Sequence, residues 1–69
     1  MNIAILGFGT VGSGVYDIVE NGDRRMRVTA IFIRPTHPAT MPEMTTNFDA
    51  ILADPNIDVV VEAIGGLHP

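Results

Sequence analysis

A short apolar run that leads into closely spaced glycines constrains this chain more than any other feature of its sequence. Residues 2–6 read NIAIL, and residues 7–14 then hold four glycines. A continuous apolar run of this length is typical of a β-strand buried on both faces. Apolar side chains then recur at helical spacing, at Val11, Val15, Ile18 and Val19. The segment therefore predicts a strand, a glycine-rich turn and, over residues 10–20, an amphipathic helix that buries these four side chains.

Three of the glycines have the spacing G-x-G-x-x-G, which is typical of the turn that binds the pyrophosphate of a dinucleotide. In that interpretation Gly7 permits the tight turn after the strand, and Gly9 lets the backbone approach the phosphates because it has no Cβ. Gly12 lets the helix pack close to the sheet, and the helix offers its free N–H groups to the ligand. A purely structural turn is the alternative, because glycines cluster in many turns.

The predicted helix is followed by a stop signal and a second strand. Asn21 and Gly22 supply the stop, with Gly22 expected in the left-handed conformation that glycine adopts at little cost. Residues 27–33, RVTAIFI, are rich in β-branched side chains and predict a strand. Strand, helix and strand within about 30 residues form a βαβ unit, which is expected to have a right-handed crossover.

The second half of the chain predicts a loop, a short helix and a last strand. Prolines interrupt residues 34–44, which predicts a loop, and residues 45–47 predict either a very short strand or only a helix cap. Asn47 is a candidate N-cap for a short helix. That helix is expected to bury Phe48, Ile51 and Leu52. Residues 57–64, IDVVVEAI, predict the last strand.

The predicted order, β-α-β-loop-α-β, indicates an α/β fold with a parallel sheet of the Rossmann type, ordered 3-2-1-4. A doubly wound sheet needs further strands beyond the fourth, so we expect residues 1–69 to be a truncated dinucleotide-binding domain. The strand at residues 58–64 would then have a bare, apolar edge. Bare edges pair with other chains, which predicts self-association through this strand.

The residue at the end of the second strand bears on the choice of cofactor. In dinucleotide folds an acidic residue about 20 residues after the glycines bonds the ribose 2′-OH of NAD. This chain has Arg34 there, 22 residues after Gly12. A guanidinium can pair with a 2′-phosphate, which favours NADP, or a site that accepts both NADP and NAD. An exposed arginine at a strand end is the structural alternative.

Composition and charge exclude several classes of function. A formal net charge of −4 provides no basic face for nucleic acid. No apolar run reaches the roughly 20 residues that span a bilayer, and the N-terminus lacks the basic segment of a signal peptide, so the expected compartment is the cytoplasm. The chain has no cysteine. His37 and His68 lie far apart without acids at ligand spacing, so no metal site is predicted.

Glu62 is the one acidic residue within the most apolar part of the last predicted strand. That context predicts burial, and a buried carboxylate is costly unless it is paired. We therefore expect Glu62 to accept hydrogen bonds from the backbone or from hydroxyl groups. Direct contact with the cofactor is the alternative.

Two longer strings resemble a known family. Residues 3–16, IAILGFGTVGSGVY, and residues 45–66, TTNFDAILADPNIDVVVEAIGG, together with the final HP, resemble the N-terminal part of homoserine dehydrogenase. The resemblance covers nearly the whole chain and is weakest at residues 35–44. The first string is shared in outline by other dehydrogenases, whereas the second is much more particular to this family.

The resemblance implies an activity and a set of cofactor contacts. The family reduces aspartate semialdehyde to homoserine with NADPH or NADH, on the branch toward threonine and methionine. By this resemblance, the pyrophosphate loop comprises Phe8, Gly9, Thr10 and Val11. Arg34 is assigned to the adenosine-ribose end, and Ile64, Gly65 and Gly66 are assigned to the nicotinamide side.

The chain departs from the family in its extent. In the family, a lysine and acidic residues of a later substrate domain support hydride transfer, and residues 1–69 contain no lysine. We therefore expect cofactor-binding residues but no catalytic residue here, and no homoserine oxidation by these 69 residues alone. Two alternatives stay open: a stand-alone dinucleotide-binding module or sensor without catalysis, and the N-terminal part of another small amino-acid dehydrogenase, such as aspartate dehydrogenase.

Overall fold

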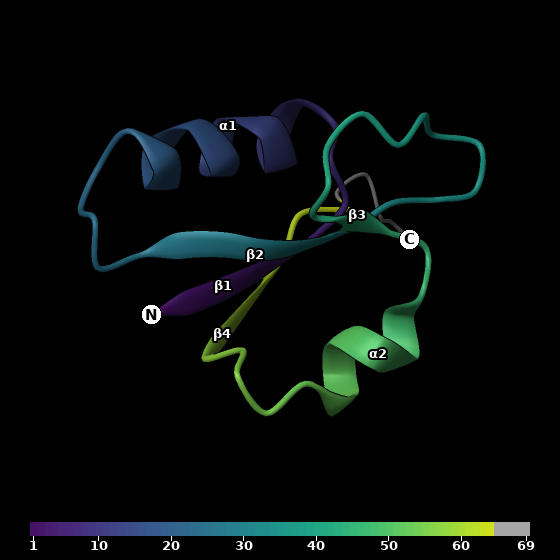
Figure 1. The fold of residues 1–69 in the computed structure, drawn as a ribbon. Coiled ribbons are helices and arrows are strands. Elements are labelled where there is room, and N and C mark those ends of the chain that lie inside the picture. Colours follow the sequence, from purple (N-terminus) through teal and green to yellow (C-terminus); the bar gives the residue numbers. More distant parts are fainter. Residues whose placement is uncertain (65–69) are drawn as a thin grey trace.

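The architecture comes from a computed structural model, which describes residues 1–64. Its elements are β1 (Asn2–Leu6), α1 (Thr10–Glu20), β2 (Arg27–Phe32), β3 (Met44–Thr45), α2 (Phe48–Ala53) and β4 (Val59–Glu62). The four strands are all parallel and lie in the order β3-β2-β1-β4. Helix α1 covers one face of the sheet and α2 lies against the other (Figure 1). The predicted α/β fold and strand order are confirmed.

Strand β1 forms the centre of the core because it pairs with β2 on one side and β4 on the other. Alternate side chains of a strand point to opposite faces of the sheet. Ile3 and Ile5 accordingly belong to the buried cluster that includes Val19 of α1, whereas Ala4 and Leu6 belong to the cluster that includes Ile51 of α2. Both faces of β1 are thus buried, as its continuous apolar sequence predicts.

Helix α1 has the predicted bounds but buries a different face. Gly12 and Val19 are buried, with Val15 and Tyr16 partly buried. By contrast, Val11 is 60% exposed and Ile18 is 75% exposed, so their predicted burial is wrong. The buried face is centred on a residue without a side chain, Gly12. Because the prediction counted only large apolar side chains, it placed the buried face of α1 about one residue too early in the sequence.

The end of α1 is formed by the backbone rather than by a left-handed glycine. The N–H of Asn21 donates to the Asp17 carbonyl at 3.0 Å, and the N–H of Gly22 donates to the Val19 carbonyl at 3.3 Å. Within residues 1–64, only Gly7 is a glycine with positive φ, so the conformation expected of Gly22 is wrong. The helix still ends where predicted, and a Cβ on residue 22 would lie 2.8 Å from the Ile18 carbonyl oxygen.

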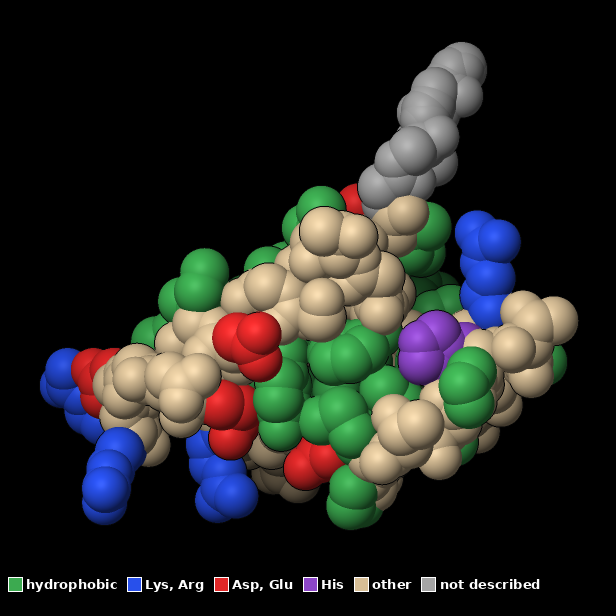
Figure 2. Space-filling model, turned by 90° about the horizontal axis from the view of Figure 1, so that it is seen from above, with side chains coloured by type: hydrophobic (Ala, Val, Ile, Leu, Met, Phe, Trp, Pro, Cys, Tyr) green, Lys and Arg blue, Asp and Glu red, His purple; other side chains and the backbone are tan. Residues whose placement is uncertain are grey.

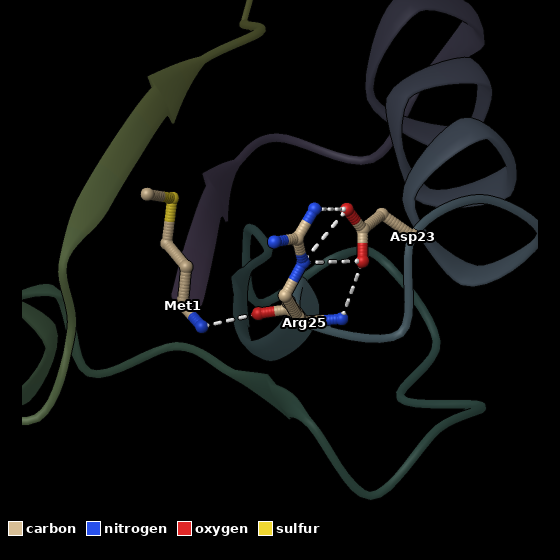
Figure 3. Close-up of polar contacts among 3 residues, drawn as sticks. All are labelled: Met1, Asp23 and Arg25. Atoms are coloured by element: carbon tan, nitrogen blue, oxygen red, sulfur yellow. Dashed lines mark hydrogen bonds and ion pairs between the residues drawn. The ribbon is translucent and has the colours of Figure 1, made fainter.

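The turn between α1 and β2 is held by an exposed polar cluster (Figure 3). Arg25 Nη2 and Asp23 Oδ2 form an ion pair at 2.6 Å, and the Arg25 N–H donates to Asp23 Oδ1 at 2.9 Å. These hydrogen bonds, the side-chain one first, lower the pKa of the Asp23 carboxyl below its ordinary value. The amino group of Met1 donates to the Arg25 carbonyl, and the N–H of Arg27 donates to the Met1 carbonyl at 2.9 Å. The cluster therefore fixes the starts of β1 and β2 side by side.

The segment 44–53 contains both of the alternatives predicted for residues 45–47. Met44 and Thr45 pair with β2 as β3, and Asn47 caps α2 by accepting from the Ala50 N–H at 3.0 Å. Of the three side chains expected to be buried by α2, only Ile51 is. Phe48 packs edge-on against Phe32, with ring centroids 5.4 Å apart, but stays partly exposed, and Leu52 is 61% exposed.

Strand β4 is half the length that residues 57–64 predict. Its pairing with β1 runs from Ile3 opposite Val59 to Leu6 opposite Glu62, and it stops where β1 stops. The second predicted strand is likewise one residue shorter than expected, since it ends at Phe32. The length of a paired strand is thus set by its partner, which a single apolar run does not reveal. Among residues 1–64, no helix is both long enough and apolar enough to cross a membrane.

Candidate functional site

A pocket of about 690 Å³ lies at the carboxyl ends of the strands. Three segments line it: the loop from β1 into α1, the end of β2 with the residues that follow, and the residues after β4. The lining residues are Gly7, Phe8, Gly9, Thr10, Val11, Phe32, Ile33, Arg34, Thr36, His37, Pro38, Ala63 and Ile64. The chain leaves β1 toward β2 on one side and returns to β4 on the other, which is the switch point where open α/β sheets bind their ligands.

Gly7 makes the turn at the floor of the pocket. Its φ is +101°, a conformation that residues with a Cβ rarely adopt. Its N–H donates to the Phe32 carbonyl at 2.9 Å, and an added Cβ would lie 3.1 Å from Ile64 Cα. The loop after β1 is therefore fixed between the ends of β2 and β4.

Gly12 lets α1 begin directly above this turn. A Cβ on residue 12 would lie 2.1 Å from the Gly7 carbonyl oxygen, which no real structure tolerates. The helix consequently approaches the end of β1 as closely as backbone atoms allow. Gly12 does not line the pocket. It lies against the Gly7 carbonyl, which agrees with its predicted role of letting the helix pack close to the sheet.

The start of α1 faces the pocket as an uncapped helix terminus. Gly9 is the N-cap residue, it makes no side-chain cap hydrogen bond, and the first turn contains no acidic residue. A Cβ on Gly9 would meet no atom of the described residues within 4 Å, so the space there is open to a ligand. The first N–H groups of a helix have no partner within the helix, and they carry partial positive charge. This part of the pocket can accept an anionic group in contact with the backbone.

The other end of the pocket combines a cation with an aromatic wall. Arg34 is the one charged side chain among the described lining residues, and it is exposed. The Phe8 ring lies edge-on to Tyr16 at 5.8 Å and to His37 at 6.4 Å, between centroids. Partial burial, and secondarily the carboxylates of Glu20, Glu43 and Asp17, raise the pKa of the Tyr16 hydroxyl. Figure 2 shows this face from above, with a histidine beside a group of hydrophobic side chains.

The structure brings together most of the residues that the sequence singles out. Seven of the predicted cofactor-binding residues line the pocket: Gly7, Phe8, Gly9, Thr10, Val11, Arg34 and Ile64. Gly65 and Gly66 lie outside the described residues. The sequence analysis missed Phe32, Ile33, Thr36, His37, Pro38 and Ala63. Their position gives the available signal, since each one lies at the carboxyl end of a parallel strand or within six residues of it.

Glu62 does not have the buried environment that its strand predicts. Its side chain is exposed, and its Oε2 accepts a hydrogen bond from the Ile64 N–H at 3.2 Å. Within the described residues no element packs outside β4, which explains the exposure. The expected role as an acceptor of backbone hydrogen bonds is confirmed. Residues 1–64 contain no group of three or more side chains placed to hold a metal ion.

The fold and the pocket define a class of protein. A parallel sheet ordered β3-β2-β1-β4, with a glycine turn and a helix start at its switch point, is the arrangement of a partial Rossmann-type fold.

Sequence comparison narrows this class to one family. The chain is 39% identical over 80 residues to a homoserine dehydrogenase of Synechocystis, an alignment that covers all of this chain and 18% of that protein. Homoserine dehydrogenases of Methylobacillus glycogenes and Bacillus subtilis are 34% and 29% identical, over 96% and 99% of this chain and 19% of each relative. The chain is thus homologous to the N-terminal part of homoserine dehydrogenases and spans about a fifth of their length. No family model matches it, and no solved structure is significantly similar.

Proposed function

We propose that this chain is the cofactor-binding part of a homoserine dehydrogenase and that its pocket binds NADP or NAD. The observation that carries the proposal is the open cradle at Gly9. This residue lines the pocket and has free space where a Cβ would be, at the start of an uncapped helix. The pyrophosphate of a dinucleotide fits such a place, because it must approach the protein backbone closely and needs N–H donors that are unpaired within the helix.

In this proposal the pyrophosphate lies against the loop of Phe8, Gly9, Thr10 and Val11. Arg34 lies at the adenosine ribose, where its guanidinium favours a 2′-phosphate and therefore NADP. Ile64 borders the nicotinamide, as do Gly65 and Gly66 by family resemblance. The bound nicotinamide supplies a hydride to the aldehyde carbon of aspartate semialdehyde. The residues of this chain hold and orient the cofactor, and the proton for the alcohol comes from residues outside it.

The test is a titration of NADP and NAD into the 69-residue chain and into two matched glycine variants. Gly9→Val places a branched side chain in the cradle, where a Cβ would meet no atom of the described residues within 4 Å. Gly14→Val is the control, because a Cβ there also meets nothing within 4 Å but does not line the pocket. We expect Gly9→Val to abolish binding of both dinucleotides and Gly14→Val to leave binding intact.

Equal affinities in the parent chain and in Gly9→Val would overturn the proposal and leave the glycines as a turn only. Heteronuclear NMR spectra of both variants report whether the fold is intact. The same preparation is expected to show no homoserine oxidation above a control without protein.

A further inference from the structure

The end of α1 carries a pair of residues, Asn21 and Gly22, that the cofactor pocket does not use. The side-chain amide of an asparagine can be attacked at Cγ by the backbone nitrogen of the next residue, and a glycine there has no side chain to obstruct the attack. The chain has four asparagines and no glutamine. The other three, Asn2, Asn47 and Asn56, are followed by isoleucine or phenylalanine, whose side chains crowd that nitrogen. Only Asn21 therefore combines an amide with an unobstructed nucleophile.

Three hydrogen bonds hold the reacting atoms of this pair apart. The Asn21 N–H and its side-chain Nδ2 both donate to the Asp17 carbonyl, at 3.0 Å and 2.9 Å. The Gly22 N–H donates to the Val19 carbonyl at 3.3 Å. The ψ angle of Asn21 is 2°, so the Gly22 nitrogen is nearly eclipsed with the Asn21 nitrogen and is turned away from the Asn21 side chain. The attack therefore requires the last turn of α1 to open first.

This last turn is the part of α1 that opens most easily. Helix ends open locally at a small fraction of the free energy of global unfolding. Asn21 and Gly22 are both exposed, so water competes for the hydrogen bonds that they make. Beyond these bonds, the Glu20 carboxylate accepts from the Val28 N–H at 3.3 Å, and Val19 is buried. The turn after Val19 can consequently open while the contact of α1 with the sheet persists.

We propose that Asn21 is a site of deamidation and that opening of the last turn of α1 controls its rate. In the open turn the Gly22 nitrogen gives its proton to solvent and forms a bond to Asn21 Cγ. The bond from Cγ to Nδ2 breaks, and Nδ2 takes up a proton and leaves as ammonia. Water then opens the resulting succinimide ring at either of its carbonyls, which yields aspartate or isoaspartate. The net reaction consumes one water and releases one ammonia, and it involves no oxidation or reduction.

The product favours the open turn. A carboxylate in place of the amide cannot donate to the Asp17 carbonyl. It also lies at the negative end of the helix dipole, and the last turn of α1 contains no basic residue to offset it. The Asp17 carboxylate, four residues earlier, adds a like charge on the same face of the helix. Deamidation should therefore weaken the fold from the end of α1 that lies opposite the pocket.

The experiment follows all four asparagines of the 69-residue chain during incubation at neutral pH, in buffer and in a denaturing concentration of urea. Peptide mapping by mass spectrometry measures each site, and electron-transfer fragmentation distinguishes isoaspartate from aspartate. In both conditions we expect Asn21 to convert first and to yield both products. Conversion in buffer should be about tenfold slower than in urea, because three exposed hydrogen bonds must break first.

A matched pair of variants changes the opening of the turn without touching the reacting residues. Ile18 is 75% exposed, and Ile18→Gly and Ile18→Ala remove the same side chain. They differ in helix propensity, so in buffer Ile18→Gly should deamidate about fivefold faster than Ile18→Ala, which corresponds to about 1 kcal/mol. In urea the two rates should be equal. Asn21→Asp, which copies one product, should lower the folding equilibrium constant about fivefold in urea unfolding.

Several results would overturn the inference. Equal rates at Asn21 and at the other asparagines would remove the role of Gly22. Equal rates in buffer and in urea, or for the two Ile18 variants in buffer, would mean that the helix end does not control the reaction. Aspartate without isoaspartate would indicate direct hydrolysis of the amide instead of a succinimide. The proposed cofactor binding does not depend on any of these results, because Asn21 does not line the pocket.

Discussion

Strands β1 and β4 lie next to each other in one sheet, have similar apolar sequences, and differ completely in their environment. In β1, four of the five residues are buried, and Ile5 has no exposed surface. In β4, Val59 and Val60 are exposed, the latter to 44%, and only Val61 packs against the core. The two strands are paired in register, so their backbones are equally regular on the shared side. The difference lies in what covers them: β1 has a strand on each side and a helix above and below, whereas no described element packs outside β4.

The contrast shows that the apolar sequence of a strand records the environment in which it is meant to lie. VVVE in β4 has the composition of a strand covered on both faces. Residues 1–64 provide that cover for β1 and not for β4. The first and third of the following four predictions test the two strands directly, and the second and fourth test contacts made around β1.

The largest difference is expected between Ile5→Ala and Val60→Ala. Truncation of the fully buried Ile5 should cost about 2–5 kcal/mol in the free energy of unfolding, because it leaves a cavity. Truncation of Val60 should cost no more than about 0.5 kcal/mol, because water already reaches it. Urea unfolding followed by circular dichroism measures both. If Ile5→Ala does not fold, Ile5→Val still provides the comparison, with an expected cost of about 0.5–1.5 kcal/mol. Similar losses at positions 5 and 60 would contradict the contrast.

The second comparison uses two glycines of α1, one against β1 and one facing open space. Gly12→Ala forces a methyl group into the Gly7 carbonyl oxygen, and relieving the overlap should cost about 1–3 kcal/mol. Gly14→Ala meets nothing and should stabilise the helix by about 0.5–1 kcal/mol. Thermal unfolding of both variants gives the sign directly. A stabilising Gly12→Ala would mean that the helix is not held against β1.

The third prediction concerns the bare edge of β4. We expect the chain to self-associate through residues 58–64, because unpaired N–H and C=O groups along an apolar strand pair with another chain. Val60→Lys places a charge on that strand and should weaken association by about tenfold, or about 1.4 kcal/mol. Sedimentation velocity over a concentration series measures the association. A monodisperse parent chain at high concentration, with fast amide exchange throughout β4, would refute the idea.

The smallest effect is expected at the exposed pair of Asp23 and Arg25. The pKa of Asp23 is lower in the folded chain than in the unfolded chain, so the unfolded state takes up a proton first. The pair therefore contributes stability above the ordinary pH range of an aspartate, and this contribution is lost as the pH falls through the folded-state pKa. Acid unfolding curves of the parent chain and Asp23→Asn should converge as the pH falls below about 4, and added salt should reduce their separation. A variant that stays equally separated from the parent at all pH values would assign another role to Asp23.

The sequence predicted the order of the elements and the type of all except β3, which it left as either a short strand or a helix cap. It failed where burial depends on partners distant in the chain. The bounds of β1 and α1 follow from a continuous apolar run, glycine spacing and helical periodicity, all of which are local. The exposure of Ile18, Leu52 and Glu62 is not local, because it depends on which elements cover them. In the pocket, the glycines and Arg34 were predictable because a spacing rule names them. His37 was not, because its place depends on a turn closed by a backbone hydrogen bond and on the ring of Phe8.

The contact between Gly7 and Gly12 has a consequence for how this turn can change in evolution. Space for a side chain at position 12 would require the Gly7 carbonyl to move, and that carbonyl belongs to a residue with positive φ whose N–H is bonded to β2. Neither position can accept a new residue first and wait for the other to adjust. The two glycines thus behave as a single inherited character, and Gly9, where a Cβ would meet no described atom within 4 Å, is the position whose variation would report selection by a ligand.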